Sequence, residues 1–247
     1  AAQQMARRAE KLLAGVEEER AVDKVAAIRF PDPAPCGKTP LTARNLTKTY
    51  GSLEVFAGVD LNIDRGSQVV VLGLNGAGKT TLLRILAGKE TPDTGEVIAG
   101  HGLKLGYFAQ EHDLLDMDRT VLENMASSAT DLNETEMRKI LGSFLFTGDD
   151  VHKPAGVLSG GEKTRLALAT LVVSSANVLL LDEPTNNLDP ASRAQVLDAI
   201  GNFGGAIVLV THDEGAVHAL DPDRVLVLPD GTEDMWSADY AELISLA

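Results

Sequence analysis

Short apolar runs separated by turns dominate the chain from Leu41 onward. Their length of three to six residues is typical of β-strands. The last three runs contain no polar residue, as expected of strands that are buried on both faces of a sheet. The runs predicted to be strands are Leu41–Leu46, Val59–Ile63, Gln68–Leu72, Glu96–Ile98, Leu103–Tyr107, Val178–Leu181, Ile207–Val210 and Val225–Leu228.

Helical periodicity dominates the middle of the chain, between about Val121 and Val173. Two further helical segments, Pro190–Phe203 and Glu214–Leu220, lie between the last three apolar runs. Alternation of strand and helix is typical of a mainly parallel sheet with helices on both sides. The pattern therefore predicts an α/β fold with a mainly parallel core sheet.

The start of the chain differs in pattern from the rest. Residues from Ala1 to about Ile28 are rich in helix formers, with apolar positions at steps of three and four. A proline-rich stretch, Phe30–Pro35, then predicts a stiff, extended connector. The first residues already have mid-helix composition and lack an initial Met, so we expect a fragment of a longer polypeptide or a trimmed form of one.

Composition and charge exclude several classes of protein. The 247 residues suffice for one large α/β domain with a small appendage. The 36 acidic and 22 basic residues give a formal charge of −14, which argues against a generally basic nucleic-acid-binding surface. No apolar stretch approaches the roughly 20 residues that cross a bilayer, so we expect no embedded membrane segment. The single Cys36 cannot form an internal disulfide, which favours the cytosol.

A glycine-rich stretch, Gly73–Thr80, satisfies the phosphate-binding pattern G-x-x-x-x-G-K-[ST]. A predicted strand precedes it and a predicted helix, Thr81–Ala87, follows, so loop N–H groups and a helix N-terminus would face one anion. Lys79 can reach the β- and γ-phosphates of a nucleotide, and the Thr80 hydroxyl can bind Mg²⁺. The alternative is a glycine-rich turn with a solvated lysine. The predicted nucleotide contacts are Gly73, Asn75, Gly76, Ala77, Gly78, Lys79, Thr80 and Thr81.

Two adjacent carboxylates, Asp182 and Glu183, end the apolar run Val178–Leu181. Ligands bind at the carboxyl ends of parallel strands in open α/β sheets, so both side chains are predicted to lie at the site. Asp182 is placed to hold Mg²⁺, and Glu183 to orient and polarise an attacking water. The alternative is that the pair simply ends the strand in solvent.

The segment Leu158–Glu162, Leu-Ser-Gly-Gly-Glu, opens an apolar helix. Ser159 is a natural N-cap and Glu162 lies three residues on, which predicts a capping box whose helix start presents N–H groups to an anion. Together with the phosphate-binding loop, this segment resembles the signature of an ATP-binding cassette (ABC) ATPase. The resemblance implies that Ser159, Gly160 and Gly161 contact the γ-phosphate held by an opposite cassette. It also implies an antiparallel β subdomain and a helical subdomain beside the core sheet.

Further positions match the ABC family, and their roles are implied by that resemblance alone. Tyr50 matches the aromatic residue that stacks on adenine, and Gln110 matches the glutamine that senses Mg²⁺ and the attacking water. Asp189 matches a dimer-contact loop, and His212 matches the switch histidine that contacts the γ-phosphate. For each, an ordinary structural role is the alternative. The resemblance implies ATP hydrolysis with Glu183, His212, Lys79 and Gln110 as catalytic residues and with Thr80, Gln110 and Asp182 as ligands of Mg²⁺.

Three segments resemble the F branch of the family, ABC-F: Gly106–Gln110, Phe144–Val151 and Leu158–Ala167. The ending Trp236–Tyr240 is similar to the tail of that branch's second cassette. Asn187 departs from the pattern, because members of this branch usually have His there.

The F branch carries two cassettes in one chain, joined by a charged helical linker and without a membrane domain. The resemblance therefore implies that residues 1–40 are the end of the linker and 41–247 the second cassette, with its helical subdomain at about 111–174. The implied partners are a second cassette in a head-to-tail ATP sandwich and the ribosome, in translation or antibiotic resistance in the cytoplasm. A transporter's nucleotide-binding subunit, and a cassette for DNA repair or a non-transport scaffold, are the alternatives.

Overall fold

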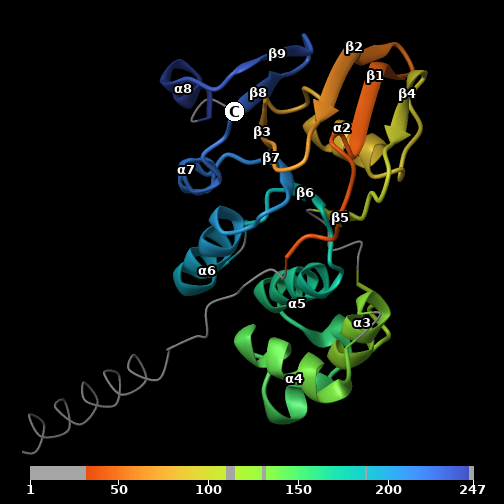
Figure 1. Ribbon diagram of the computed structural model, residues 1–247. Coiled ribbons are helices and arrows are strands. Elements are labelled where there is room, and N and C mark those ends of the chain that lie inside the picture. The colour runs from red at the N-terminus through yellow and green to blue at the C-terminus, as the bar shows by residue number, and fades with distance from the viewer. Residues whose placement is uncertain (1–31, 110–114, 130–131, 187, 245–247) are drawn as a thin grey trace, which may run out of the picture.

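The computed structural model describes residues 32–109, 115–129, 132–186 and 188–244 (Figure 1). The strands of these residues form a six-stranded sheet and a three-stranded sheet. The helices are α2 (Lys79–Leu86), α3 (Val121–Ser128), α4 (Glu134–Ser143), α5 (Gly160–Val173), α6 (Pro190–Gly201), α7 (Glu214–Leu220) and α8 (Ala241–Ile244), with 3-10 turns at Gly148–His152, Ala155–Val157 and Ala238–Tyr240.

The six-stranded sheet is mainly parallel, as predicted. All its neighbouring strands run parallel except the edge strand Thr232–Met235, which runs antiparallel to its neighbour. Figure 1 shows α6 and α7 packed on one side of this sheet, while α3 and α4 lie together at one end of the molecule. The strand order is β5 (Leu105–Phe108), β6 (Val178–Asp182), β7 (Ala206–Val210), β3 (Gln68–Leu72), β8 (Arg224–Val227) and β9 (Thr232–Met235).

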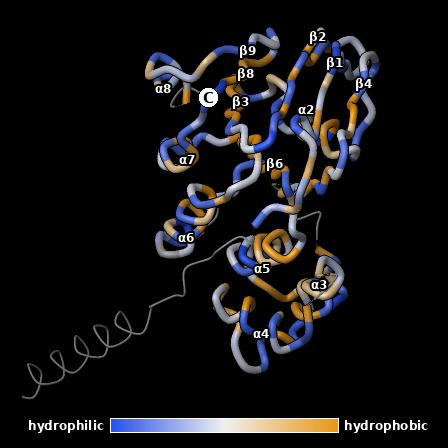
Figure 2. The backbone as a smooth tube through the Cα atoms, in the orientation of Figure 1, coloured by the Kyte–Doolittle hydropathy of each residue, from blue (hydrophilic) through white to orange (hydrophobic). Residues whose placement is uncertain are grey.

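The central strands are apolar throughout because both faces of the sheet are covered. On β3, Val69 and Val71 pack in a core that includes the antiparallel sheet and α2. Val70 and Leu72 point the other way, into a core shared with the helices. Successive side chains of a strand alternate between faces, so a strand between two cores needs apolar residues at every position. In Figure 2 the trace through β3 is accordingly coloured as hydrophobic.

The smaller sheet is antiparallel, as the ABC resemblance implies, in the order β2 (Leu53–Ile63), β1 (Leu41–Tyr50), β4 (Thr94–Ala99). The predicted strand Val59–Ile63 is the second half of β2. Its first half escaped prediction because its burial pattern does not alternate. β9 was also missed, because all four of its residues are exposed and carry no hydrophobic pattern.

The predicted helical stretch from Val121 to Val173 contains α3, α4 and α5, with two of the 3-10 turns between the last two. Each helix begins with a capping box, which joins two residues three positions apart. The side chain of each residue accepts a hydrogen bond from the backbone N–H of the other. The capping box predicted at Ser159 is therefore confirmed: the Glu162 N–H donates to the Ser159 hydroxyl at 3.3 Å, and the Ser159 N–H to the Glu162 carboxylate at 2.8 Å.

The predicted N-terminal helix, Ala1 to about Ile28, lies outside the described residues. The described part of the proline-rich connector, from Asp32, forms no helix or strand. Asn177, which is buried just before β6, donates from its amide to the Ala34 carbonyl at 3.1 Å. This bond ties the connector to the base of the central sheet. The predicted division at residue 40 stays a prediction.

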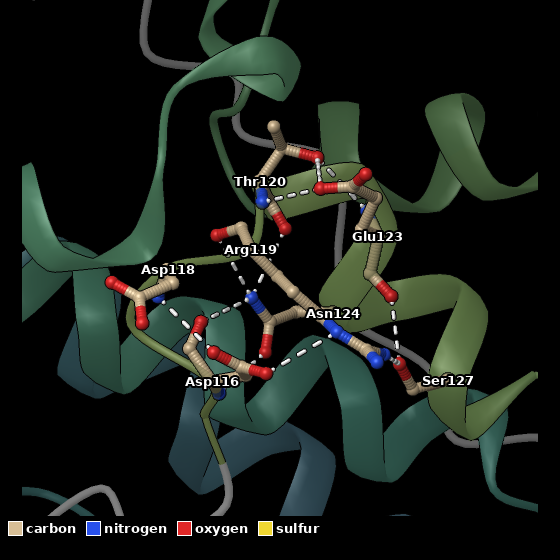
Figure 3. A network of polar contacts seen from close by, with 7 residues as sticks. All are labelled: Asp116, Asp118, Arg119, Thr120, Glu123, Asn124 and Ser127. Carbon is tan, nitrogen blue, oxygen red and sulfur yellow. Dashed lines mark hydrogen bonds and ion pairs between the residues drawn. The ribbon is translucent and has the colours of Figure 1, made fainter.

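A buried asparagine organises the loop that leads into α3 (Figure 3). The Asn124 side chain accepts from the Asp116 N–H at 2.9 Å, and its amide donates to the carbonyls of Asp116, Arg119 and Thr120 at 3.0–3.2 Å. Asn124 is only 4% exposed. The three carbonyls also accept backbone N–H groups, from Arg119, Ala155 and Asn124 itself, so the amide adds a second contact to each of them. The Asp116 N–H, in contrast, is bonded to the Asn124 side-chain oxygen. The loop immediately follows residues 110–114, where the predicted site residue Gln110 lies.

We expect Asn124→Ala to lower the free energy of unfolding by about 2 kcal/mol, because it removes a buried side chain with its hydrogen bonds and leaves the Asp116 N–H without its partner. Ser127→Ala is the matched control: Ser127 belongs to the same network, but it is on the exposed surface of α3, and its loss should cost at most about 0.5 kcal/mol. Urea denaturation of both variants measures the difference. Equal effects would contradict the role given to Asn124.

Candidate functional site

The phosphate-binding loop lies where predicted, between the end of β3 and the start of α2. Gly76 and Gly78 have φ values of +87° and +92°, a conformation that side chains with a Cβ rarely adopt. A Cβ on Gly78 would also come within 2.9 Å of the Phe56 ring and would clash with Val55. Glycine at this position therefore lets the loop lie close against β2, with its backbone turned toward the α2 N-terminus.

Lys79, the first residue of α2, folds back over this loop. Its ammonium group donates to the carbonyls of Gly73 and Leu74 at 2.5 and 3.2 Å. Burial lowers the pKa of Lys79, and the negative charges of Glu183 and Asp182 act in the opposite direction. A buried cation held by neutral carbonyls gains electrostatic energy from an anion brought next to it, which fits a phosphate group.

Asp182 ends β6 at the predicted carboxyl edge and is 1% exposed. Burial raises its pKa, while the nearby Thr80 hydroxyl and the positive charges of Arg84 and Lys79 lower it. Within the described part of the chain, neither carboxylate oxygen has a hydrogen-bond partner of good geometry. Buried carboxylate oxygens without donors, next to a hydroxyl, are ligands that Mg²⁺ prefers. The residues present therefore fit a Mg²⁺ ion.

Glu183 follows in a strained and buried position. Its φ of +50° is left-handed, and its N–H donates to the Val210 carbonyl at 2.9 Å. Burial raises the pKa of Glu183 to about 7, the adjacent Asp182 adds to this rise, and a hydrogen bond from the His212 N–H opposes it. A carboxyl group that titrates near neutral pH is suited to accept a proton from water.

His212 faces Glu183 from the loop after β7. Its ring Nε2 lies 3.0 Å from one Glu183 carboxylate oxygen, and its backbone N–H donates to the other at 3.3 Å. Burial and the charge of Lys79 lower the pKa of His212. Its side chain is 38% exposed, so packing holds the ring only in part.

One cleft of about 310 Å³ joins these groups. It brings together most of the predicted contacts, although Gly73 and Ala77 support the loop without lining the cleft. Sequence reasoning missed Leu53, Val55, Asn186 and Val210 as lining residues. Burial does not alternate along the first half of β2, which carries Leu53 and Val55, so their place directly after Tyr50 is the signal that could have suggested them. The lining residues are Tyr50, Leu53, Val55, Asn75, Gly76, Gly78, Lys79, Thr80, Thr81, Asp182, Glu183, Asn186, Val210 and His212.

Tyr50 stands at the mouth of this cleft and is 49% exposed. Its hydroxyl donates to Glu90 at 2.5 Å. Lys48 forms an ion pair with the same carboxylate at 3.0 Å and lies 5.2 Å from the centre of the tyrosine ring. These contacts fix the orientation of an exposed aromatic face, on which a flat apolar group could stack.

The remaining predicted site residues lie elsewhere. Ser159 and Gly160 are exposed and Gly161 is half-buried at the start of α5, and none of the three lines the cleft. Asp189 accepts from the Ser192 N–H at 3.0 Å and from its hydroxyl at 2.6 Å, and so caps α6. Gln110 and Asn187 lie outside the described residues.

Comparisons with known proteins agree with this geometry. Residues 56–186, more than half of the chain, match the family model described as "ABC transporter". The chain is 35% identical over 239 residues to ABC transporter F family member 5 of Arabidopsis thaliana, covering 94% of this chain and 34% of that protein. It is 39% identical over 207 residues to the probable ATP-binding protein YheS of Escherichia coli K12, covering 83% of this chain and 32% of that protein.

Solved structures show the same fold. The ATP-binding cassette MJ0796, in a dimeric post-hydrolysis state bound to ADP and Pi, superposes with a TM-score of 0.66 at 25% identity, covering 80% of this chain and 99% of that one. The chain spans about a third of the length of its curated relatives. Among the helices of the described residues, none combines the length and hydrophobicity that a membrane span requires. The family match and the F-branch relatives together confirm the resemblance: the chain belongs to the ABC family of ATP-binding cassettes and to its F branch.

Proposed function

We propose that this cleft binds ATP with Mg²⁺ and hydrolyses the bond between the β- and γ-phosphates. The observation that carries the proposal is the convergence of Lys79, Asp182, Glu183 and His212 on one cleft beside a phosphate-binding loop. Tyr50 would stack on the adenine ring at the cleft mouth. Thr80 and Asp182 would hold Mg²⁺ together with Gln110, and the bound ion would neutralise charge on the phosphate oxygens.

The chain's own residues stabilise the developing charge, activate the water and hold the catalytic carboxylate. The Lys79 ammonium and the loop N–H groups stabilise negative charge that develops on the γ-phosphoryl oxygens. Glu183 aligns a water molecule and accepts its proton as the water oxygen bonds to the γ-phosphorus and the bridging oxygen leaves with ADP. His212 keeps the Glu183 carboxylate in place through its two contacts and supports the γ-phosphate.

We propose that a second cassette completes the site. The start of α5 at Ser159 is exposed and lies outside the chain's own cleft. Its capping box uses the N–H groups of Ser159 and Glu162, so those of Gly160 and Gly161 would donate to the γ-phosphate of a facing cassette. The dimeric cassettes among the solved structures support this arrangement. The Asn186 N–H donates to the Glu183 carbonyl at 3.2 Å and closes a turn over residues 183–186, the Glu183 turn. Asp189 follows shortly after this turn and would lie at the contact between the two cassettes.

We propose further that the chain is the C-terminal cassette of a two-cassette F-type protein that acts on the ribosome, in translation or antibiotic resistance, in the cytoplasm. The F-branch relatives support it, and so does the coverage of about a third of their length. A nucleotide-binding subunit of a transporter is the second candidate, because the matching family model carries that description.

Glu183→Gln tests the hydrolytic role. We expect ATP binding to persist while hydrolysis falls at least a hundredfold, because the amide cannot accept the proton. ATP should then trap a closed two-cassette form, visible by size-exclusion chromatography with and without ATP. Glu96→Gln, on the exposed strand β4, is the control with normal turnover. Normal turnover in Glu183→Gln, or full turnover by a dilute solitary cassette, would remove the proposed mechanism.

The raised pKa of Glu183 predicts a pH dependence of stability. A carboxyl whose pKa rises from 4.5 to about 7 on folding binds more protons in the folded than in the unfolded state between these pH values. The contribution of Glu183 to the free energy of unfolding is therefore greatest below pH 4.5 and falls as the pH rises toward 7. Relative to Glu183→Gln, the wild type should lose up to about 3 kcal/mol of unfolding free energy across this window and no more above it.

Urea denaturation at several pH values, without nucleotide, measures this difference. Glu96→Gln serves again as the control and should parallel the wild type. A constant difference between wild type and Glu183→Gln from pH 4.5 to 8 would show that Glu183 titrates as an ordinary exposed carboxyl.

Ribosome co-sedimentation separates the two candidate uses. The full-length protein with Glu183→Gln should sediment with ribosomes in ATP and not in ADP, since only ATP holds the cassettes closed. Recovery of a membrane subunit with the protein, and no sedimentation with ribosomes, would favour the transporter subunit.

A further inference from the structure

An ion pair links helix α6 to the loop that carries His212. The Arg193 Nε donates to one carboxylate oxygen of Asp213 at 2.7 Å, and its Nη2 donates to the other at 2.5 Å. Two parallel bonds between a guanidinium and a carboxylate fix the relative orientation of both groups, which a single contact does not. Arg193 is one turn into α6, and its N–H donates to the Asp189 carbonyl at 2.9 Å.

Asp213 connects this arginine, and with it α6, to two neighbouring segments. One of its oxygens accepts from the Gly215 and Ala216 N–H groups at 2.8 and 3.3 Å and so caps α7. The hydrogen bonds from Arg193 contribute most to a lowered pKa of Asp213, and the Thr185 hydroxyl adds to the effect. Thr185 is two residues after Glu183. Asp213 therefore ties α6, α7 and the Glu183 turn together.

His212 is directly before Asp213 in the chain, and its exposed ring depends on how the backbone of this loop is held. The Asp213 N–H donates to the Thr211 hydroxyl at 3.0 Å, so both neighbours of His212 take part in the loop's bonding. The His212 contacts to Glu183, at 3.0 and 3.3 Å, require the loop to stay within a few tenths of an ångström of its position.

Gly215 makes room for the ion pair. A Cβ at this position would lie 2.6 Å from Arg193 Nη2 and 3.0 Å from the Asp213 oxygen that Nη2 contacts. Its φ lies outside the left-handed range, so alanine fits the backbone of α7 and removes only the space that the guanidinium occupies. Gly215→Ala is therefore a way to disturb the pair without changing any charge.

We propose that Arg193 is a positioning residue: through its two bonds to Asp213 it fixes the His212 loop relative to α6 and Glu183. The proposal rests on ATP hydrolysis at this cleft. The Arg193 side chain is 43% exposed, and ion pairs at such exposure contribute little to folding stability. We therefore assign its role from its position beside His212. Loss of the pair should lower kcat about tenfold and change KM for ATP less than twofold, because His212 acts on the reacting phosphate more than on nucleotide binding.

The test measures kcat and KM for Arg193→Gln, Arg193→Lys and Gly215→Ala in the full-length protein. Gly142→Ala is the control, because a Cβ on this α4 glycine meets nothing within 4 Å. We expect Arg193→Lys to recover part of the loss, since it keeps the charge without the second bond. The double variant Arg193→Gln/Gly215→Ala should be no slower than Arg193→Gln alone, because both changes remove the same contact.

A readout without hydrolysis keeps the test independent of the proposed function. With ¹³C-labelled histidine, the His212 ring signal, assigned by its loss in His212→Gln, should shift or broaden in Arg193→Gln and Gly215→Ala and stay unchanged in Gly142→Ala. If the wild type hydrolyses no ATP, the proposed function fails and this signal still decides the positioning role. Additive losses in the double variant, a rise in KM with unchanged kcat, or an unchanged His212 signal would overturn the inference.

Discussion

The buried charge at the carboxyl end of β6 is the constraint on which the rest of the structure depends. Asp182 and Glu183 follow an apolar strand into a region that raises the pKa of both, and the same burial lowers the pKa of Lys79 opposite them. Each group is less well solvated than in water, so the site gains stability from a ligand that brings both anionic oxygens and a cation. The apolar strands and the tight glycine loop hold the two carboxylates and the lysine close together.

Local patterns allowed much of this to be predicted from sequence. A strand between two cores, such as Val178–Leu181, is recognisable because no position can be polar, and the capping box at Ser159 depends on residues three apart. The phosphate-binding loop is equally local. Placing Asp182 and Glu183 at the cleft required only the rule that parallel strands gather ligands at their carboxyl ends.

What escaped prediction depends on distant or weak signals. The first half of β2, with Val55 against the loop, lacks alternation, so its contribution to the cleft could not be deduced from its own residues. The bond between Arg193 and Asp213 joins positions 20 apart on different elements, and neither residue type is unusual where it stands. The two residues meet because α6 packs against α7, and no periodic pattern in the sequence predicts that packing.

The left-handed backbone of Glu183 has a consequence for how this protein can change. At φ +50° a side chain costs about 1 kcal/mol relative to glycine, and the buried acid adds its own cost at neutral pH. Both penalties fall on the residue to which we assign proton transfer, so stability and turnover would oppose each other at this position. A protein that no longer needs to hydrolyse nucleotide could therefore gain stability through Glu183→Gly, the same substitution that would remove the proposed catalytic carboxylate.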